Sequence, residues 1–503
     1  MTHIQLKQIS FTLLFFAFAS LALAQKQNIL IECDFWKGSP TVQAVQQKIG
    51  EGNDPTQLNR FAFDPMVYAI LEKAPMDVMR LLLEQEGNDV NKITHDGRTY
   101  LFWAAYKDNL PLMKHLFERG ALTDVIDDHG YSLLNFAAVT GQQNPKLYDF
   151  IFAHGASVSE KNNDGANALL LLLPHLKNED MVTYFNSKGT ALSDTDNDGN
   201  GAFNYTAKGG NIDMLKWLID QGSDVQTLSA NGENAMLFAS KGMRGHENNL
   251  EVFEFLDSEG IKTDIITKSG TSPLLAYAAD GGDLEVFKFF LAKGADPDHV
   301  NKEGNTALML AAKHNNIRAV RMLLAESENV NAANSEGRTA LMNAVQSNTA
   351  DVVRLLLDKG ADAQAKDREG NNLLYYLIRS YSAKEAGDFE EKRAYLEGSG
   401  LNLATPQANG NTLYHLAAQL NDLPLLKGAS EMGLDINAKN KEGLTPLHIA
   451  AMKAESDAVM KYLLSQGADK SIRTAFDESA HDLAHENEVL NAHKTDLKFL
   501  EIE

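Results

Sequence analysis

The chain has 503 residues, of which 44% are hydrophobic and 23% are charged, as is usual for a folded protein. Its formal net charge is -22, because 46 Lys and Arg stand against 68 Asp and Glu. Nucleic acids are bound by clustered Lys and Arg, and no run of either occurs here, so a nucleic-acid partner is not expected. The single cysteine, Cys33, excludes an internal disulfide bond.

The N-terminus has the three-part pattern of a secretory signal peptide. Met1–Ser10 is polar, Phe11–Leu23 is mostly apolar, and Ala22-Leu23-Ala24 supplies the small residues that a signal peptidase recognises. A membrane-spanning helix needs about 20 apolar residues, more than this run or any later one supplies. We therefore expect a signal peptide over 1–24, export to the periplasm or the exterior, and no membrane insertion afterwards. The alternative is a buried N-terminal helix.

A glycine recurs at a nearly constant interval along most of the chain. The ten intervals run from 33 to 40 residues, and five of them are 33. The recurring glycines are Gly97, Gly130, Gly165, Gly199, Gly232, Gly270, Gly304, Gly337, Gly370, Gly410 and Gly443. A period of 33 is that of a turn followed by two helices, repeated along a solenoid. The longest intervals place insertions near 242–249 and 380–388, whose role the sequence does not indicate.

The most regular copy shows how one repeat is built. Gly443 permits a tight turn, Thr445 can cap the following helix, and Pro446 fits the first helical turn. Ala450 and Ala451 give this helix a small face that lets the neighbouring repeat approach closely. Neither helix of a repeat can bury its apolar face alone, so each repeat depends on its neighbours.

This copy resembles the ankyrin repeat family. Thr445-Pro446-Leu447-His448-Ile449-Ala450-Ala451 nearly matches the family signature, and Gly467-Ala468-Asp469 matches its closing turn. Further copies begin at Gly304 and Gly337, and the resemblance covers about residues 34–500. It implies an all-α, curved solenoid of about 13 helix–turn–helix repeats with a concave binding face, acting as a monomer.

The resemblance also implies where the array begins and ends and which side chains hold the repeats together. We expect a degenerate N-terminal capping repeat over 25–62, the array over 63–470 and a degenerate C-terminal capping repeat over 471–503. His415 and His448 would tie turns to the neighbouring backbone. Five aromatic residues in one phase of the repeat would pack between repeats: Trp103, Phe136, Tyr205, Phe238 and Tyr376.

Two segments contain residue patterns that are typical of metal sites. The ankyrin repeat accounts for both patterns better than a metal site does. Asp194-x-Asp196-x-Asp198-Gly199 begins like a calcium loop, but the twelfth position holds Tyr205 instead of the required Glu. His481 and His485 share a helix face as in metalloproteases, with no third ligand evident. No nucleophile elbow, phosphate loop or dinucleotide fingerprint occurs. We therefore expect no enzyme activity, no metal and no cofactor.

Binding is expected on the concave face, at the turn tips and after the Ala-Ala pair. The predicted partner-binding residues are His95, Arg98, Tyr106, Lys107, His129, Tyr131, Lys302, Lys313, His314, Arg338, Arg368 and Arg379. Tyr106 and Tyr131, on adjacent repeats, are the preferred anchors, since Tyr and Arg dominate interface hot spots. The expected function is a non-catalytic, exported scaffold or adaptor for a protein partner. One alternative is an immunity, inhibitor or stress-protective protein that blocks an enzyme; a weaker one is a metal-dependent hydrolase.

Overall fold

The computed structural model describes residues 28–313, 317–381, 386–431 and 433–502. The predicted signal peptide at 1–24 and His314 lie outside these residues. Within them the regular structure is helical, and pairing of extended backbone is limited to isolated bridges. None of the described helices combines the length and the apolar character needed to cross a membrane.

The chain divides into two units, Met1–Thr227 and Leu228–Glu503. The helices of the first unit are η1 (Ile29–Ile31), α2 (Cys33–Lys37), α3 (Val42–Gly50), α4 (Pro65–Leu71), α5 (Met76–Leu83), η2 (His95–Gly97), α6 (Tyr100–Tyr106), α7 (Leu110–Glu118), α8 (Leu133–Val139), α9 (Pro145–Ala153), α10 (Ala168–Leu172), η3 (Leu173–His175), α11 (Asp180–Lys188), α12 (Ala202–Gly209) and α13 (Ile212–Asp220).

The second unit continues the alternation of short helices. Its helices are α14 (Ala235–Lys241), α15 (Leu250–Ser258), α16 (Pro273–Asp280), α17 (Leu284–Ala292), α18 (Ala307–Lys313), α19 (Ile317–Glu326), α20 (Ala340–Ser347), α21 (Ala350–Asp358), α22 (Leu373–Arg379), α23 (Ala386–Gly398), α24 (Leu413–Gln419), α25 (Leu423–Glu431), α26 (Pro446–Lys453), α27 (Ala458–Ser465), α28 (Ala480–Glu486), α29 (Glu488–Ala492) and η5 (Lys498–Leu500).

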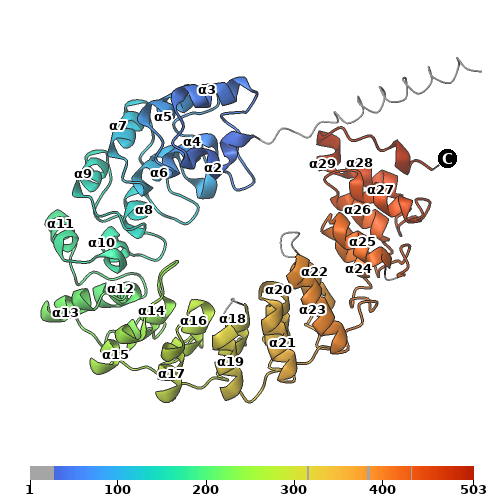
Figure 1. Ribbon diagram of the computed structural model, residues 1–503. Coiled ribbons are helices and arrows are strands. Elements are labelled where there is room, and N and C mark those ends of the chain that lie inside the picture. The colour runs from blue at the N-terminus through green and yellow to red at the C-terminus, as the bar shows by residue number, and fades with distance from the viewer. Residues whose placement is uncertain (1–27, 314–316, 382–385, 432, 503) are drawn as a thin grey trace, which may run out of the picture. The chain divides into compact units, whose positions relative to one another are not determined.

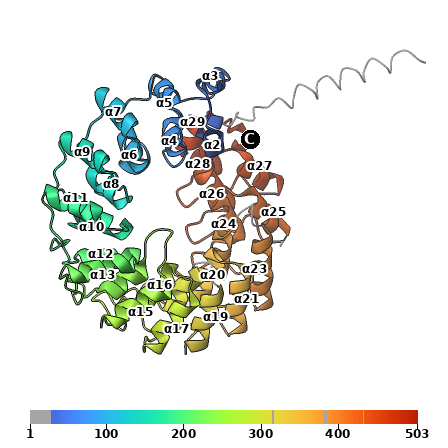
Figure 2. The same cartoon turned by 60° about the vertical axis from the view of Figure 1, so that its left-hand side comes forward.

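The helices stack as pairs in chain order. Within each unit the first helix of a pair packs on the first helix of the next, as α6 does on α8 and α18 on α20 (Figure 1). The same neighbours lie side by side in the second view (Figure 2). In the described residues thirteen pairs run from α4 and α5 to α28 and α29, preceded by the short pair α2 and α3. The predicted all-helical solenoid of about thirteen repeats is confirmed.

All eleven recurring glycines adopt the left-handed backbone conformation, with φ between 73° and 86°. Each turn closes as a small hairpin. In the second one, for example, the Asp127 N–H donates to the Tyr131 carbonyl oxygen over 3.0 Å. An L-residue with a Cβ adopts this φ only at a cost, which is why glycine recurs at this point of every turn.

Successive turns are joined by backbone hydrogen bonds. In the second unit the N–H of Lys302 donates to the Ser269 oxygen over 3.0 Å. The next turns repeat the bond, from Ser335 to Glu303 at 2.7 Å and from Arg368 to Glu336 at 2.8 Å. We call this series the turn ladder. The ladder fixes the position of each turn relative to the next one along the array, and it requires that the turns approach each other closely.

The histidines of the family signature tie neighbouring repeats together. The Nδ1 atom of His448 accepts the Thr445 N–H over 3.0 Å, and its Nε2 atom lies 3.1 Å from the Ile472 oxygen of the next repeat. His415 makes the equivalent contacts with Thr412 and Leu444. Burial lowers the pKa of both imidazoles, in keeping with a neutral ring that accepts at one nitrogen and donates at the other. The framework role predicted for these histidines is confirmed.

The in-phase aromatic residues are framework as well. Four of them, Trp103, Phe136, Phe238 and Tyr376, are at most 8% exposed, and Tyr205 is half-buried. Three donate to the residue that opens their own turn: Trp103 to Thr94 over 2.8 Å, Tyr205 to Asp196 over 3.0 Å, and Tyr376 to Asp367 over 2.6 Å. These three side chains therefore connect their first helix to the turn before it.

The first pair and the two insertions depart from the regular repeat. In the first pair the Trp36 side chain is fully buried and its Nε1 atom donates to the Leu30 oxygen over 2.8 Å, while Val42 stays partly exposed. Residues 242–249 link α14 to α15 without lengthening either helix. Of the second insertion, 386–388 begin α23, and 382–385 lie outside the described residues.

Replacing Gly337 by Ala tests the turn ladder. The substitution is strained at a φ of 77°, and a Cβ atom there would lie 2.7 Å from the backbone nitrogen of Arg368. We expect a loss of about 1–3 kcal/mol in the free energy of unfolding. The measurement is the midpoint of urea unfolding followed by circular dichroism.

Gly428→Ala is the matched control. Gly428 lies inside α25, where a Cβ atom would meet nothing within 4 Å, so alanine is expected to stabilise the helix by about 0.5–1 kcal/mol. A Gly337→Ala midpoint equal to that of the unmodified chain would show that the close approach of the turns is dispensable.

Candidate functional site

Three of the predicted residues of the first unit lie around one carboxylate, that of Asp96. The Nε2 atoms of His95 and His129 lie 3.3 and 3.2 Å from Oδ2 of Asp96, and an Arg98 nitrogen lies 3.1 Å from the same oxygen. The Asp96 backbone is left-handed, with a φ of 57°. Burial alone would raise the pKa of Asp96, but the His129 hydrogen bond and the nearby positive charges bring it below its ordinary value.

Arg98 contributes mainly to the contacts between repeats and little to the accessible surface. Its side chain is only 11% exposed, and Nε donates to Oδ2 of Asp127 over 2.8 Å. The guanidinium carbon lies 4.6 Å from the centre of the Phe136 ring. Arg98 therefore joins two adjacent turns through Asp96 and Asp127, and offers a partner little free surface.

Tyr106 is exposed at the edge of this cluster, and the half-buried Lys107 lies beside it. Tyr106 is 39% exposed, and its ring packs 6.4 Å from Trp103 and 6.3 Å from Phe136, measured between centroids. The Lys107 ammonium lies 5.4 Å from the Tyr106 ring. Tyr131 is half-buried, and burial raises its pKa. Of the predicted residues of the first unit, Tyr106 and His129 are therefore exposed, His95, Lys107 and Tyr131 are half-buried, and Arg98 is mostly buried.

The predicted residues of the second unit lie along consecutive repeats. Four of them are exposed: Lys302, Lys313, Arg368 and Arg379. Arg338 is half-buried, pairs with Glu336 at 2.9 Å and lies 5.7 Å from the Tyr376 ring.

One feature of the second unit escaped the sequence analysis. A cavity of about 270 Å³ is lined by Tyr375, Ile378, Arg379, Leu416, Gln419, Leu420 and Lys453. Of these, only Arg379 was among the predicted binding residues. The available signal was the pair Leu377-Ile378, which stands where regular repeats carry two alanines.

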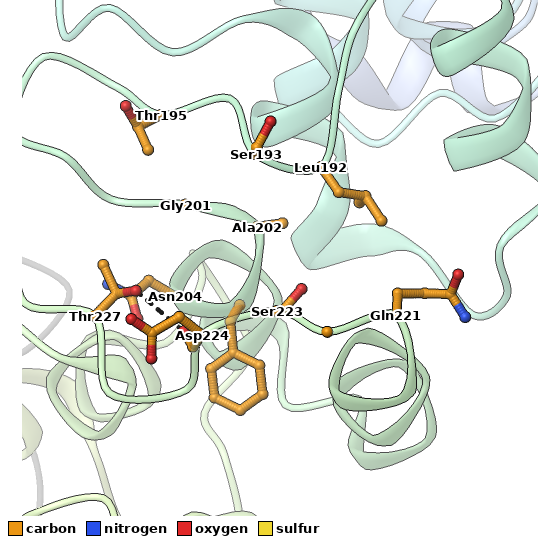
Figure 3. A pocket seen from close by; sticks show the side chains of 12 residues that line it. Leu192, Ser193, Thr195, Gly201, Ala202, Asn204, Gln221, Ser223, Asp224 and Thr227 are labelled. Carbon is orange, nitrogen blue, oxygen red and sulfur yellow. Dashed lines mark hydrogen bonds between the residues drawn. The ribbon is translucent and has the colours of Figure 1, made fainter.

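A second cavity, of about 480 Å³, lies in the first unit near the start and the end of the pair α12 and α13 (Figure 3). In three other repeats an Asn side chain, Asn91, Asn331 or Asn437, accepts from and donates to the closing turn of the next repeat. Ser193 occupies the equivalent position here and is too short to bridge that gap. The lining of the cavity holds hydroxyl and amide groups, with Asp224 as the one carboxylate.

The acidic turn and the histidine pair are also accounted for by the fold. Asp196 accepts the N–H groups of Asp198 and Asn200, and Asp194 accepts the Ala191 N–H over 3.0 Å. His481 and His485 lie 3.2 Å apart at their Nε2 atoms. In the described ranges no group of three or more His, Cys, Asp or Glu is placed to hold a metal ion.

The repeated turn and helix pair, with ordered turns that carry varied exposed side chains, define the class of solenoid repeat proteins. Two family models match the sequence: "Ankyrin repeats (3 copies)" over residues 37–127, 66–162, 275–367 and 369–474, and "Ankyrin repeats (many copies)" over 205–256. Together they cover well over half of the chain. The chain belongs to the ankyrin repeat family.

Individual relatives are distant and match only in part. The chain is 23% identical to ankyrin repeat protein nuc-2 of Neurospora crassa over 197 residues, which are 39% of this chain and 18% of the relative. It is 33% identical to human protein phosphatase 1 regulatory subunit 27 over 84 residues, or 17% of this chain and 54% of the relative. The chain thus spans less than two thirds of the length of these relatives.

A solved ankyrin repeat domain is similar to part of the chain. The crystal structure of the human ASB11 ankyrin repeat domain has 26% sequence identity and a TM-score of 0.39, and the match covers 46% of this chain and 99% of that chain.

Replacing Arg98 and Tyr106 separately distinguishes support from surface. Arg98→Ala leaves the buried Asp127 carboxylate without its cation, so we expect a loss of about 1–3 kcal/mol in the free energy of unfolding. Tyr106→Ala removes a side chain that is 39% exposed and should cost no more than about 1 kcal/mol. Thermal unfolding followed by circular dichroism measures both; equal shifts would contradict the assignment.

Proposed function

We propose that this protein is an exported, non-catalytic scaffold that binds a protein partner, as a monomer, through its turns and first helices. The observation that supports the proposal most directly is the turn ladder. Backbone hydrogen bonds of 2.7–3.0 Å hold successive turns such as those at Ser269, Glu303 and Glu336 in register, while the side chains at their tips differ from repeat to repeat.

A surface of this kind favours binding because it is ordered beforehand. Association costs less free energy when the contacting groups need not be immobilised in the complex. The first unit adds apolar area to the tips: Phe61, Ile93 and Ile126 are 51%, 56% and 57% exposed. Together with Tyr106 and the neighbouring Lys107 they give the mixture of apolar and charged groups that protein interfaces use.

Matched double variants test the binding surface of the first unit. We expect Tyr106→Ala with Lys107→Glu to reduce recovery of partners from the native envelope fraction by about tenfold or more, because an exposed aromatic residue and its neighbouring cation are lost. The measurement is affinity capture followed by quantitative mass spectrometry.

Phe117→Ala with Lys114→Glu is the control. It changes the same residue types on the second helix of the same repeat, where Phe117 is 38% exposed. Equal recovery by the two double variants would rule out the proposed surface, and no partner captured by the unmodified chain would rule out the scaffold.

Export rests on residues 1–24, whose polar, apolar and small-residue segments motivate it. We expect the mature chain to begin at Gln25 and to be found outside the cytoplasm, whereas deletion of the apolar segment Phe11–Leu23 should retain the protein inside. Cell fractionation with N-terminal mass spectrometry measures both. An intact N-terminus in a cytoplasmic fraction would contradict the proposal.

A regulatory role is the second candidate. It is supported by the partial similarity to a protein whose name describes a regulatory subunit of a phosphatase. In this version the chain blocks or redirects an enzyme by covering part of its surface. If the captured partner is an enzyme, its rate measured with and without the chain decides between the two roles, and an unchanged rate favours the scaffold.

A further inference from the structure

The first helices α22, α24 and α26 of the second unit enclose the cavity of about 270 Å³ described above, which we call the α22–α26 pocket. Its lining comes from Tyr375, Ile378 and Arg379 of α22, Leu416 and Gln419 of α24 with Leu420 after it, and Lys453 at the end of α26. These elements all lie within the second unit.

The pocket follows from two bulky residues at a position where the repeat requires small ones. The first helices α24 and α26 carry Ala417-Ala418 and Ala450-Ala451, all buried, at the point of closest approach. At the same point α22 carries Leu377 and Ile378, which are 1% and 3% exposed. Because interiors are close-packed, extra methylene groups at a contact push the neighbouring elements apart and leave space beside them.

The charged side chains that line the pocket are all positive. Ile378 and Leu416 form an apolar floor that is at most 5% exposed, and Leu420 at the margin is 44% exposed. Arg379 and Lys453 are exposed cations that form no ion pair within the described residues, and no Asp or Glu lines the cavity. The pocket therefore combines an apolar base with two free positive charges, on a chain whose net charge is -22.

The Arg379 guanidinium is partly oriented before any partner arrives. Its carbon lies 5.2 Å from the centre of the Tyr375 ring, a cation–π contact that limits the conformations of the side chain. A planar guanidinium offers parallel N–H donors that match a carboxylate. Gln419, whose amide both donates and accepts, is exposed beside it and suits a peptide backbone.

The size of the pocket selects the kind of occupant. Sites for complete small molecules usually occupy about 300–1,000 Å³ and enclose most of the ligand. This pocket is smaller and takes one large side chain instead. We propose that it binds an acidic peptide segment of the protein partner, with an apolar side chain on the floor and a neighbouring carboxylate against Arg379 and Lys453. This inference rests on the proposed scaffold function and deepens it.

The test uses the mature chain and a displayed library of random short peptides. We expect the unmodified protein to enrich peptides in which Asp or Glu stands next to Leu, Ile, Phe or Trp. The enriched peptide, labelled with a fluorophore, should bind the double variant Arg379→Glu with Lys453→Glu about tenfold or more weakly, because two attractive charges become repulsive. Fluorescence anisotropy gives the dissociation constants, and circular dichroism confirms that the variants are folded.

The control variant carries Arg318→Glu with Arg321→Glu. Both residues are exposed on α19, so the change in net charge is the same but lies away from the pocket. Binding of the peptide within about twofold of the unmodified chain is expected for this variant. An equal loss in both variants would show that only total charge matters and would overturn the proposal.

The remaining outcomes separate the pocket from the scaffold. Enriched peptides without acidic residues, or no enrichment at all, overturn the pocket proposal. If a partner is still captured from the envelope fraction by both charge variants equally, the scaffold function stands and the pocket is not its site. If nothing is captured by the unmodified chain, the scaffold function itself fails.

Discussion

The structure depends on the backbone hydrogen bond that joins one turn to the next. The bond forms only when the turns approach closely, and at several tips this leaves no room for a Cβ atom. At Gly304 a Cβ atom would lie 3.0 Å from the Ser335 nitrogen, and at Gly337 it would lie 2.7 Å from the Arg368 nitrogen. The regular spacing of glycines in the sequence reflects this contact between turns, which recurs along the array.

The other framework contacts follow from the ladder. Once a turn is fixed, its first residue can accept from an aromatic donor on the following helix, as Thr94 does from Trp103 and Asp367 does from Tyr376. The signature histidine then connects the helix to the backbone of the next repeat, as His448 does with Ile472. These contacts pair buried polar groups that would be costly to leave without a hydrogen bond.

Departures from the regular repeat produce the surface that is available for function. Where Leu377 and Ile378 replace two alanines, packing between neighbours is incomplete and a cavity remains. Because each repeat contacts only its neighbours, such changes alter the surface locally and leave the rest of the array intact. A solenoid can therefore acquire a binding site by single substitutions.

The sequence by itself determined the fold, because the repeat depends on local features that recur in phase: the turn glycine, the capping residue and the small helical face. It also identified Tyr376 and Trp103 as framework, and it named candidate residues for the binding surface. Only the tertiary structure decided which candidates are accessible. Arg98 and Tyr106 occupy similar surface positions in the pattern, yet Arg98 is held by Asp127 from the next repeat while Tyr106 is open. The α22–α26 pocket depends in the same way on contacts among three repeats. Side-chain partners contributed by neighbouring repeats are not encoded in the pattern of any single one, and for that reason burial and cavities required the folded chain.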